Sequence, residues 1–235
     1  KELPKTTPRS GYSHKLKDYK RLNPSAQNEI FLLDFKMQQA EILFMHKSAQ
    51  FSKEQLPIIT LFNEYFGGSM SSIVFQEIRE KKALAYSVYS GYTRTTKKED
   101  PHYVLAYIGT QVDKYEVAMK AMLDLLDELP YDSLKFNQAK EAIKQKYATN
   151  RIAEHQILSS YRADKKLGYD HDKRQDTFEQ IENLNFADLV HFFNTYIKGS
   201  SYRIAILGDA DKINLKKLAD FGKVQQVNFE DIFPY

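Results

Sequence analysis

FGGSMSSIVFQEIREKKALAYSVYS, residues Phe66–Ser90, is the stretch of this sequence that decides the fold. The glycine pair Gly67 and Gly68 can end a helix, because glycine accepts positive φ and lets another element approach closely. The serines that follow carry hydroxyls that can accept hydrogen bonds from free N–H groups at the start of a second helix. From Leu84 the apolar positions alternate, which is typical of a strand. The stretch therefore predicts a helix end, a second helix and a strand in close succession.

The second helix and the strand deliver one arginine and one tyrosine to the same region. Met70, Val74 and Ile78 recur at a spacing of four, which predicts a buried stripe on the helix. Arg79 falls in the last turn of that helix and Tyr86 early in the strand, so a tight connection could direct both side chains to one pocket. On spacing alone a solvated helix-end cation and a core tyrosine are the more common explanation.

The whole stretch resembles the C-terminal domain of a zinc metallopeptidase family that includes pitrilysin, insulin-degrading enzyme and the mitochondrial processing peptidase. The resemblance is carried, in order, by the glycine pair, the serines, Phe75, the run 77–80 and the run 84–87, and it extends over about residues 29–228. In this family two homologous α+β domains face each other as a clamshell. One domain bears an H-x-x-E-H zinc motif, and the other supplies an arginine and a tyrosine that hold the substrate backbone.

The resemblance implies a role for each residue that matches the family pattern. Arg79 and Tyr86 would hydrogen-bond the substrate carbonyls and the oxyanion of the transition state, an effect worth about 3 kcal/mol. Phe75, Gly67 and Gly68 would take part in substrate binding. The chain would then be the non-catalytic, substrate-binding half of a metallopeptidase. Its partners would be a peptide substrate and an H-x-x-E-H-bearing homologous domain, either upstream in the same chain or in a separate subunit.

The sequence contains no complete zinc motif. H-x-x-E-H needs two histidines on one helical face with a glutamate between them as general base. None of the six histidines lies within four residues of another. The nearest approach is Arg151–His155, but an arginine at the first position has no free lone pair and cannot bind zinc. We therefore expect no metal site and no cofactor in this segment, zinc in the partner domain, and no proteolytic activity from the segment alone.

Composition excludes several other classes of protein. The 235 residues carry a formal net charge of +3, which is too small to indicate nucleic-acid binding by itself. The absence of cysteine excludes a disulfide framework and thiolate chemistry. No apolar run is long enough to span a membrane, and no signal peptide is recognisable. Because the sequence begins with Lys1, we expect a soluble segment of a longer chain, for which a periplasmic or an organellar location is compatible.

The order of the predicted elements favours one α+β domain at 29–235, after a linker or lead-in at 1–28 that is rich in proline and lysine. Strands come first, then a block of helices, then a returning strand, which predicts a largely antiparallel sheet packed against a layer of helices. The predicted strands are 30–35, 39–46, 84–93, 103–110 and 202–206. The predicted helices are 54–65, 113–129 with a capping box at Asp113 and Glu116, one starting at Asp132 or Ser133, 157–167 before Gly168, 186–197 after Asn185, and 215–221.

Two alternatives remain at this point. A structural or interaction subunit without proteolytic role, like the core proteins of the respiratory cytochrome bc complex in the same family, would use the sheet and its strand edges to bind a partner. Nucleic-acid binding through Lys97–Lys98 and Lys216–Lys217 is weaker, because these pairs are short and no aromatic side chains interleave them for base stacking. An upstream H-x-x-E-H would favour a protease half over a scaffold.

Overall fold

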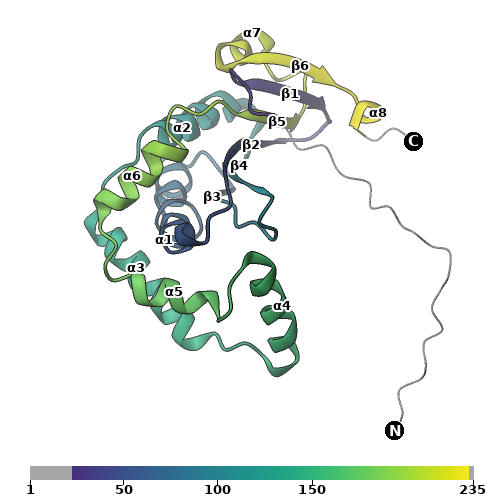
Figure 1. Cartoon of the computed structure of the whole chain (residues 1–235). Helices are drawn as coiled ribbons and strands as arrows, with labels where there is room; N and C mark the ends of the chain where they lie inside the picture. Colours follow the sequence, from purple (N-terminus) through teal and green to yellow (C-terminus); the bar gives the residue numbers. More distant parts are fainter. Residues whose placement is uncertain (1–22, 233–235) are drawn as a thin grey trace, which may run out of the picture.

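The structure, a computed structural model, describes residues 23–232 and contains a six-stranded sheet with helices along one side of it (Figure 1). Most of the predicted lead-in, residues 1–22, lies outside the described residues. The sheet has the order β3-β4-β2-β5-β1-β6. Its strands are β1 (Glu29–Asp34), β2 (Gln39–Gln50), β3 (Ser87–Tyr92), β4 (Pro101–Gln111), β5 (Arg203–Gly208) and β6 (Lys223–Val227).

The sheet is largely antiparallel, as the sequence predicts. The pairs β3–β4, β4–β2 and β2–β5 are antiparallel, whereas β1 pairs in parallel with both β5 and β6. Along β1, β2, β4 and β5 buried residues alternate with residues on the opposite face, so one face of the sheet carries the core. The mixed α/β architecture confirms the predicted α+β class.

Helices α2, α6, α3 and α5 follow one another in an arc, and α4 lies at its far end (Figure 1). The longer helices are α1 (Leu56–Phe66), α2 (Tyr115–Asp127), α3 (Ser133–Thr149), α4 (Ile157–Leu167), α5 (Lys173–Gln180) and α6 (Phe186–Tyr196). The short ones are α7 (Leu215–Leu218) and α8 (Phe229–Ile232), the 3₁₀ turns η1 (Lys53–Gln55), η3 (Val112–Lys114), η4 (Glu154–Gln156) and η5 (Ala219–Phe221), and the π-helix η2 (Phe75–Lys81).

Local sequence signals explain where several helices begin and end. The Asp132 carboxylate accepts a hydrogen bond from the Lys135 N–H at 3.0 Å and caps α3. Asn185 and Asp188 form a reciprocal capping box on α6. Gly168 ends α4 with φ of +87°, a conformation that glycine adopts without a Cβ clash. These caps confirm the predicted helix boundaries.

Some of the elements differ from the prediction. The capping box expected at Asp113 is absent, because α2 begins at Tyr115 and the Glu116 carboxylate instead accepts a hydrogen bond from Lys217 Nζ at 2.9 Å. Strand β6 and helix α5 have no counterpart in the predicted elements. Both are mostly polar and exposed, so neither carries the apolar period that sequence analysis depends on.

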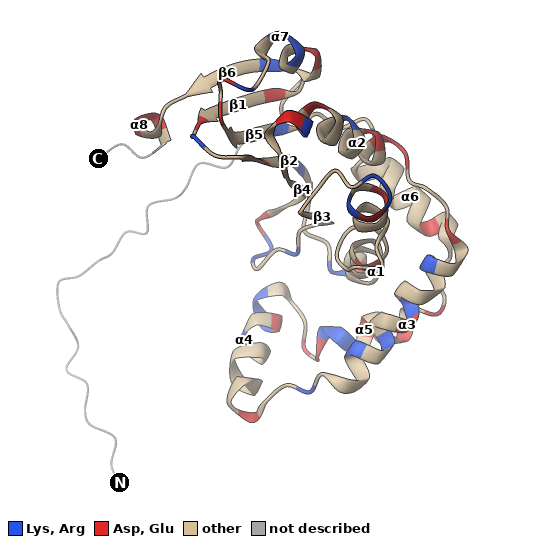
Figure 2. Cartoon of the chain, turned by 180° about the vertical axis from the view of Figure 1, so that it is seen from behind, with Lys and Arg blue, Asp and Glu red and all other residues tan. Residues whose placement is uncertain are grey.

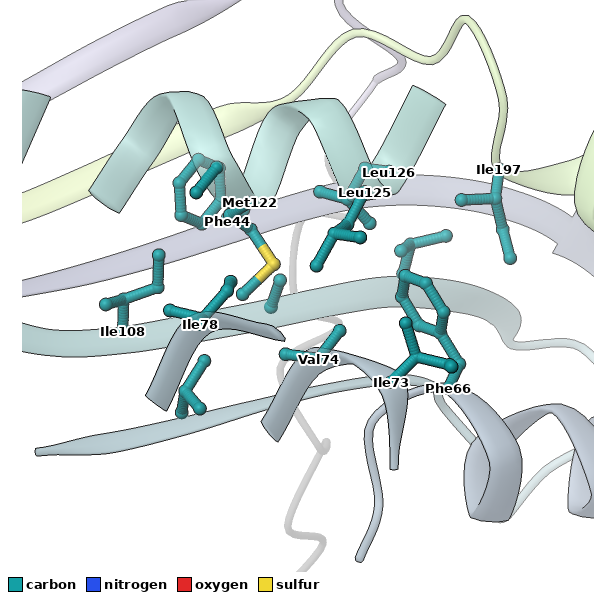
Figure 3. Close-up of a cluster of buried hydrophobic side chains, with 14 of the residues drawn as sticks. Phe44, Phe66, Ile73, Val74, Ile78, Ile108, Met122, Leu125, Leu126 and Ile197 are labelled. Carbon is teal, nitrogen blue, oxygen red and sulfur yellow. The ribbon is translucent and has the colours of Figure 1, made fainter. Parts of the chain in front are cut away.

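The core forms where the sheet meets α2 and the segment around η2 (Figure 3). Phe44 from β2, Ile108 from β4, Met122 from α2, and Val74 and Ile78 near η2 are all completely buried. Burying side chains of this size stabilises the folded state by about 1.5–3 kcal/mol each. The face of η2 that carries Ile78 is thereby fixed against the sheet, and this determines where its other face points.

The predicted apolar stripe on this helix is correct at two of its three positions. Val74 and Ile78 are buried, but Met70 is 73% exposed. Met70 lies in the turn before the helix, so the spacing of four does not continue back to it.

Candidate functional site

The glycine pair brings the end of α1 into direct contact with β3. The Ser90 N–H donates to the Gly67 carbonyl at 3.2 Å, and a Cβ on Gly67 would lie 2.6 Å from the Ser90 nitrogen. At Gly68 an added Cβ would lie 2.7 Å from the Asn63 carbonyl oxygen. Neither glycine has positive φ, so close approach alone is the reason for glycine at both positions. Their predicted contact with substrate stays a prediction.

The outer edge of β3 is covered over part of its length. Besides the bond between Ser90 and Gly67, the Tyr92 N–H donates to Asn63 Oδ1 at 2.7 Å, and Asn63 Nδ2 donates back to the Tyr92 carbonyl at 2.9 Å. Since β3 is an edge strand of the sheet, these bonds block strand addition along 90–92. The start of β3, next to Tyr86, is the part of this edge that forms no hydrogen bonds with α1 or the glycine pair.

The serines after the glycines do not cap the second helix in the way the sequence suggests. The Ser72 hydroxyl donates to the Ser69 carbonyl at 2.6 Å, and the Ser69 hydroxyl donates to the Glu64 carbonyl at 3.3 Å. The hydroxyls thus tie the turn to itself and to α1. The helix that follows is wound as a π-helix from Phe75, a rare form that often occurs at functional sites.

Arg79 extends from the exposed side of η2. Its guanidinium carbon lies 4.8 Å from the centroid of the Phe75 ring, which is only 9% exposed and forms a fixed platform beneath the charge. The Arg79 side chain is 43% exposed, and its Nε lies 3.9 Å from the Glu80 carboxylate, at the limit of an ion pair. The guanidinium therefore keeps donors available to a ligand.

Tyr86 stands directly before β3 and is 52% exposed. Its hydroxyl accepts a hydrogen bond from Gln111 Nε2 at 2.9 Å, and its backbone N–H donates to the Gly109 carbonyl at 2.8 Å. The side chain is thus oriented by the neighbouring strand β4. The bond from Gln111 uses an oxygen lone pair and leaves the phenolic proton free to donate.

The connection between η2 and β3 is held from both sides. The Leu84 N–H donates to the Ile78 carbonyl at 3.0 Å, and the Leu84 carbonyl accepts from the Thr110 hydroxyl at 2.5 Å. Ala83 adopts φ of +49°, a left-handed conformation that is uncommon for a residue with a Cβ. A hollow of about 70 Å³ opens beside it, lined by Ala83, Tyr86, Gln111 and Lys114 among others.

The structure places Arg79 and Tyr86 on either side of this fixed connection, and both are exposed. Arg79 does not line the hollow beside Tyr86, and no hydrogen bond joins the two side chains within the described residues. Their convergence on one bound peptide stays a prediction.

Two residues that orient the site were not predicted from the sequence: Gln111, which holds Tyr86, and Asn63, which holds β3. The signal for Gln111 is the hairpin register, because Ser87 pairs with Gly109 and the next outward positions bring Gln111 to the start of β3. Asn63 carries no such signal. It lies on a helix, and its partner at Tyr92 is 29 residues away in the sequence.

The segment Arg151–His155 forms no metal site in the structure. Glu154 and His155 lie in the exposed turn η4 before α4. Across residues 23–232 no group of three or more histidine, aspartate or glutamate side chains is placed to hold a metal ion. Among the same residues, no helix combines the length and the apolar character needed to cross a membrane.

Residues 2–145 match the family model described as the peptidase M16 inactive domain. The chain belongs to this family. The match includes the whole Phe66–Ser90 stretch and more than half of the chain, and it confirms the resemblance inferred from that stretch.

Two curated relatives of this inactive M16 domain bear the name of uncharacterized zinc proteases. YmxG of Bacillus subtilis (strain 168) is 31% identical over 110 residues, which make up 46% of this chain and 26% of the relative. SCO5738 of Streptomyces coelicolor is 30% identical over 120 residues, which make up 51% of this chain and 26% of the relative. The chain therefore matches about a quarter of the length of each.

Solved structures support the fold. The M16 inactive domain from Pseudomonas fluorescens superposes with a TM-score of 0.66 at 16% identity, covering 80% of this chain and 47% of the other. A protease from Helicobacter pylori gives a TM-score of 0.63 at 19% identity, covering 76% of this chain and 43% of the other. At such identities the likeness shows the fold alone.

Proposed function

We propose that this inactive M16 domain is the substrate-binding half of a zinc metallopeptidase. In this function Arg79 and Tyr86 hold the backbone of a bound peptide while a partner domain carries the zinc. The observation that carries the proposal is that both side chains are exposed and yet oriented, Arg79 by the Phe75 ring and Tyr86 by Gln111. Polar groups held in this way are suited to a ligand rather than to the core.

The chemistry of the two side chains suits a peptide carbonyl. When zinc-bound water in the partner domain attacks the scissile bond, negative charge develops on the carbonyl oxygen. The Arg79 guanidinium and the free phenolic proton of Tyr86 can donate to that oxygen or to its neighbours along the peptide. Because their orientation is fixed before substrate binds, little reorganisation is needed when the charge forms.

The surrounding backbone supports the same function. Between Phe75 and Tyr86 the chain forms a π-helix and then a left-handed residue, Ala83. Leu84 follows, and its N–H and its carbonyl are both hydrogen-bonded. Unusual backbone of this kind costs free energy and is concentrated at functional sites. It keeps the arginine and the tyrosine at a constant separation.

The partner that the proposal requires is an H-x-x-E-H-bearing homologous domain. The relatives named as zinc proteases are about four times as long as the segment they share with this chain. We infer that the zinc half is supplied by the rest of a longer chain or by a separate subunit, and that the substrate is a peptide.

The test is to substitute Arg79→Ala and Tyr86→Phe in the protease assembled with its H-x-x-E-H domain. Losing one donor to the oxyanion lowers kcat/KM by about 10²–10³-fold. Zinc content, measured by atomic absorption, is expected to stay unchanged because neither residue binds the metal. Lys82→Ala, which removes a nearby exposed cation, is the matched control and should retain activity. Full activity in either site variant would show the assignment to be wrong.

A structural subunit is the second candidate, and the sheet face opposite the helices favours it. Phe31, Leu43, Met45 and Ala205 line a shallow hollow of about 450 Å³ there, with the Glu29–Arg203 ion pair beside them. A partner domain seated on this face would use the domain as a scaffold. Leu43→Glu would then abolish co-purification with the partner, while Arg79→Ala would leave all measured function intact.

A further inference from the structure

A second cleft lies between the tip of the β3–β4 hairpin and helix α4. It has a volume of about 780 Å³ and is lined by residues of the hairpin tip, of η4 and α4, and by Lys173 at the start of α5. It shares no lining residue with the hollow beside Tyr86. Its size is within the usual range for ligand pockets.

The lining of this cleft is strongly cationic. Lys97, Arg162, Lys166 and Lys173 contribute to it, whereas Glu99 is the one carboxylate among its lining residues. Figure 2 shows basic residues at the hairpin tip, at one end of α4 and at the start of α5, around the same space. A concave surface with charges of one sign concentrates ligands of the opposite sign.

The two cations on α4 are available to a ligand. Arg162 and Lys166 are exposed, one helical turn apart on the same face, and neither forms an ion pair with any residue from 23 to 232. By contrast Lys173 is already paired with the Asp164 carboxylate at 2.9 Å. The charge that a ligand could neutralise is therefore concentrated on α4.

A smaller niche of about 30 Å³ adjoins the cleft. Thr95, Leu167 and Lys173 line both spaces, and Phe51 and Tyr169 add apolar walls to the niche. A cavity of this volume holds a water molecule or a group of similar size.

His102 presents an unpaired acceptor to this niche. The side chain is 2% exposed, and its Nδ1 lies 2.6 Å from the Thr93 carbonyl oxygen. A carbonyl can only accept, so Nδ1 carries a proton, and burial lowers the pKa of His102, which favours the neutral ring. In the neutral ring Nε2 is a bare lone pair, and neither it nor the Thr95 hydroxyl oxygen has a hydrogen-bond partner among residues 23–232. Buried polar groups of this kind are normally hydrogen-bonded.

We propose that this cleft binds an acidic peptide segment. Its carboxylates lie against Arg162 and Lys166, and a serine or threonine hydroxyl enters the niche and donates to His102 Nε2. A peptide fits better than a compact anion, because the cleft has a volume of about 780 Å³ and its lining places the apolar side chains Leu158 and Leu167 beside the cations of α4. The proposal goes beyond substrate holding by Arg79 and Tyr86 and does not depend on it.

The test measures fluorescence anisotropy of the fluorescein-labelled peptide EEESEEE with the chain Lys1–Tyr235. The double substitution Arg162→Glu with Lys166→Glu is expected to weaken binding at least tenfold. The double substitution Lys198→Glu with Lys216→Glu makes the same change in net charge on exposed residues elsewhere and should leave binding unchanged. Equal losses in the two double variants would overturn the proposal, because they would show a general charge effect.

The niche has its own test. Thr95→Val keeps the shape of the side chain and removes the unpaired hydroxyl. It thereby removes one of the two unpaired polar atoms that a peptide hydroxyl would meet in the niche, so it is expected to weaken EEESEEE several-fold and to leave EEEAEEE, which lacks the hydroxyl, unaffected. Equal effects on both peptides would overturn the assignment of the niche. Displacement of EEESEEE by millimolar inorganic phosphate, or tighter binding of a single-stranded RNA of equal charge, would overturn the assignment to an acidic peptide.

Discussion

At Arg79 a charged side chain is held by an aromatic ring instead of a carboxylate. The guanidinium stacks at 4.8 Å on the Phe75 ring, while Glu80 approaches no closer than 3.9 Å. A close ion pair would orient the side chain and occupy its donors, whereas the ring orients it and leaves the N–H groups free. Phe75 is thus a positioning residue in the proposed function.

Phe75→Leu isolates this effect in the assembled protease. Leucine keeps a buried apolar side chain but removes the ring face, and a cation–π contact at an exposed site is worth about 0.5–1 kcal/mol. We expect kcat/KM to fall about 2- to 5-fold, with zinc content unchanged. In the Arg79→Ala background the same substitution should have no further effect, since the cation is already gone. An equal loss in both backgrounds would show that Phe75 acts by packing alone.

At the scale of single elements, the loop between α4 and α5 contains a charge arrangement that responds to pH. His171 lies with Nδ1 at 2.8 Å from the Asp170 carboxylate and Nε2 at 2.6 Å from that of Asp176. Both ring nitrogens must donate to satisfy these contacts, so the contacts favour the charged ring. The hydrogen bonds that the ring donates to Asp170 and Asp176 raise the pKa of His171 above its usual 6.5.

A raised pKa stabilises the folded state below the unfolded value of 6.5, and the contribution is lost as pH rises through the folded value. We therefore expect Tm to fall as pH increases above 6.5, and we expect this part of the pH dependence to be absent in His171→Gln. Thermal unfolding of the unsubstituted protein and of His171→Gln, followed by circular dichroism at closely spaced pH values, measures the two pH profiles of Tm. Parallel pH profiles for the two proteins would contradict the assignment.

Elements with local signals could be predicted from the sequence, and those held by distant contacts could not. Asp132 and Asn185 cap helices within three residues of themselves, so their role is visible in the sequence. The π-helical winding of η2 and the left-handed conformation of Ala83 follow from packing against the sheet. No local sequence pattern predicts either of them. For the candidate site, the resemblance identified Arg79 and Tyr86, whereas Gln111 required the strand register.

At the scale of the whole molecule, the first strand is enclosed by the last two. β1 lies between β5 and β6 and pairs in parallel with both. Its buried residues Ile30 and Leu32 depend on these neighbours. Removing the end of the chain should therefore affect its beginning.

Two truncations test this dependence. A chain that ends after Lys198 lacks both partners of β1 and is expected to lose cooperative thermal unfolding and to bind a hydrophobic dye. A chain that ends after Gly222 keeps β5 but lacks β6 and the short helix α8, and it should melt cooperatively at a lower temperature. If the chain that ends after Lys198 unfolds like the intact chain, β1 does not need β5 and β6 as partners.

The same topology has a consequence during protein synthesis. Glu29 at the start of β1 and its partner Arg203 are separated by 174 residues. At about 5–20 residues per second, β1 leaves the ribosome about 9–35 s before β5. During that time Ile30 and Leu32 have no strand to pair with, so this short apolar segment is where we expect a ribosome-associated chaperone to bind.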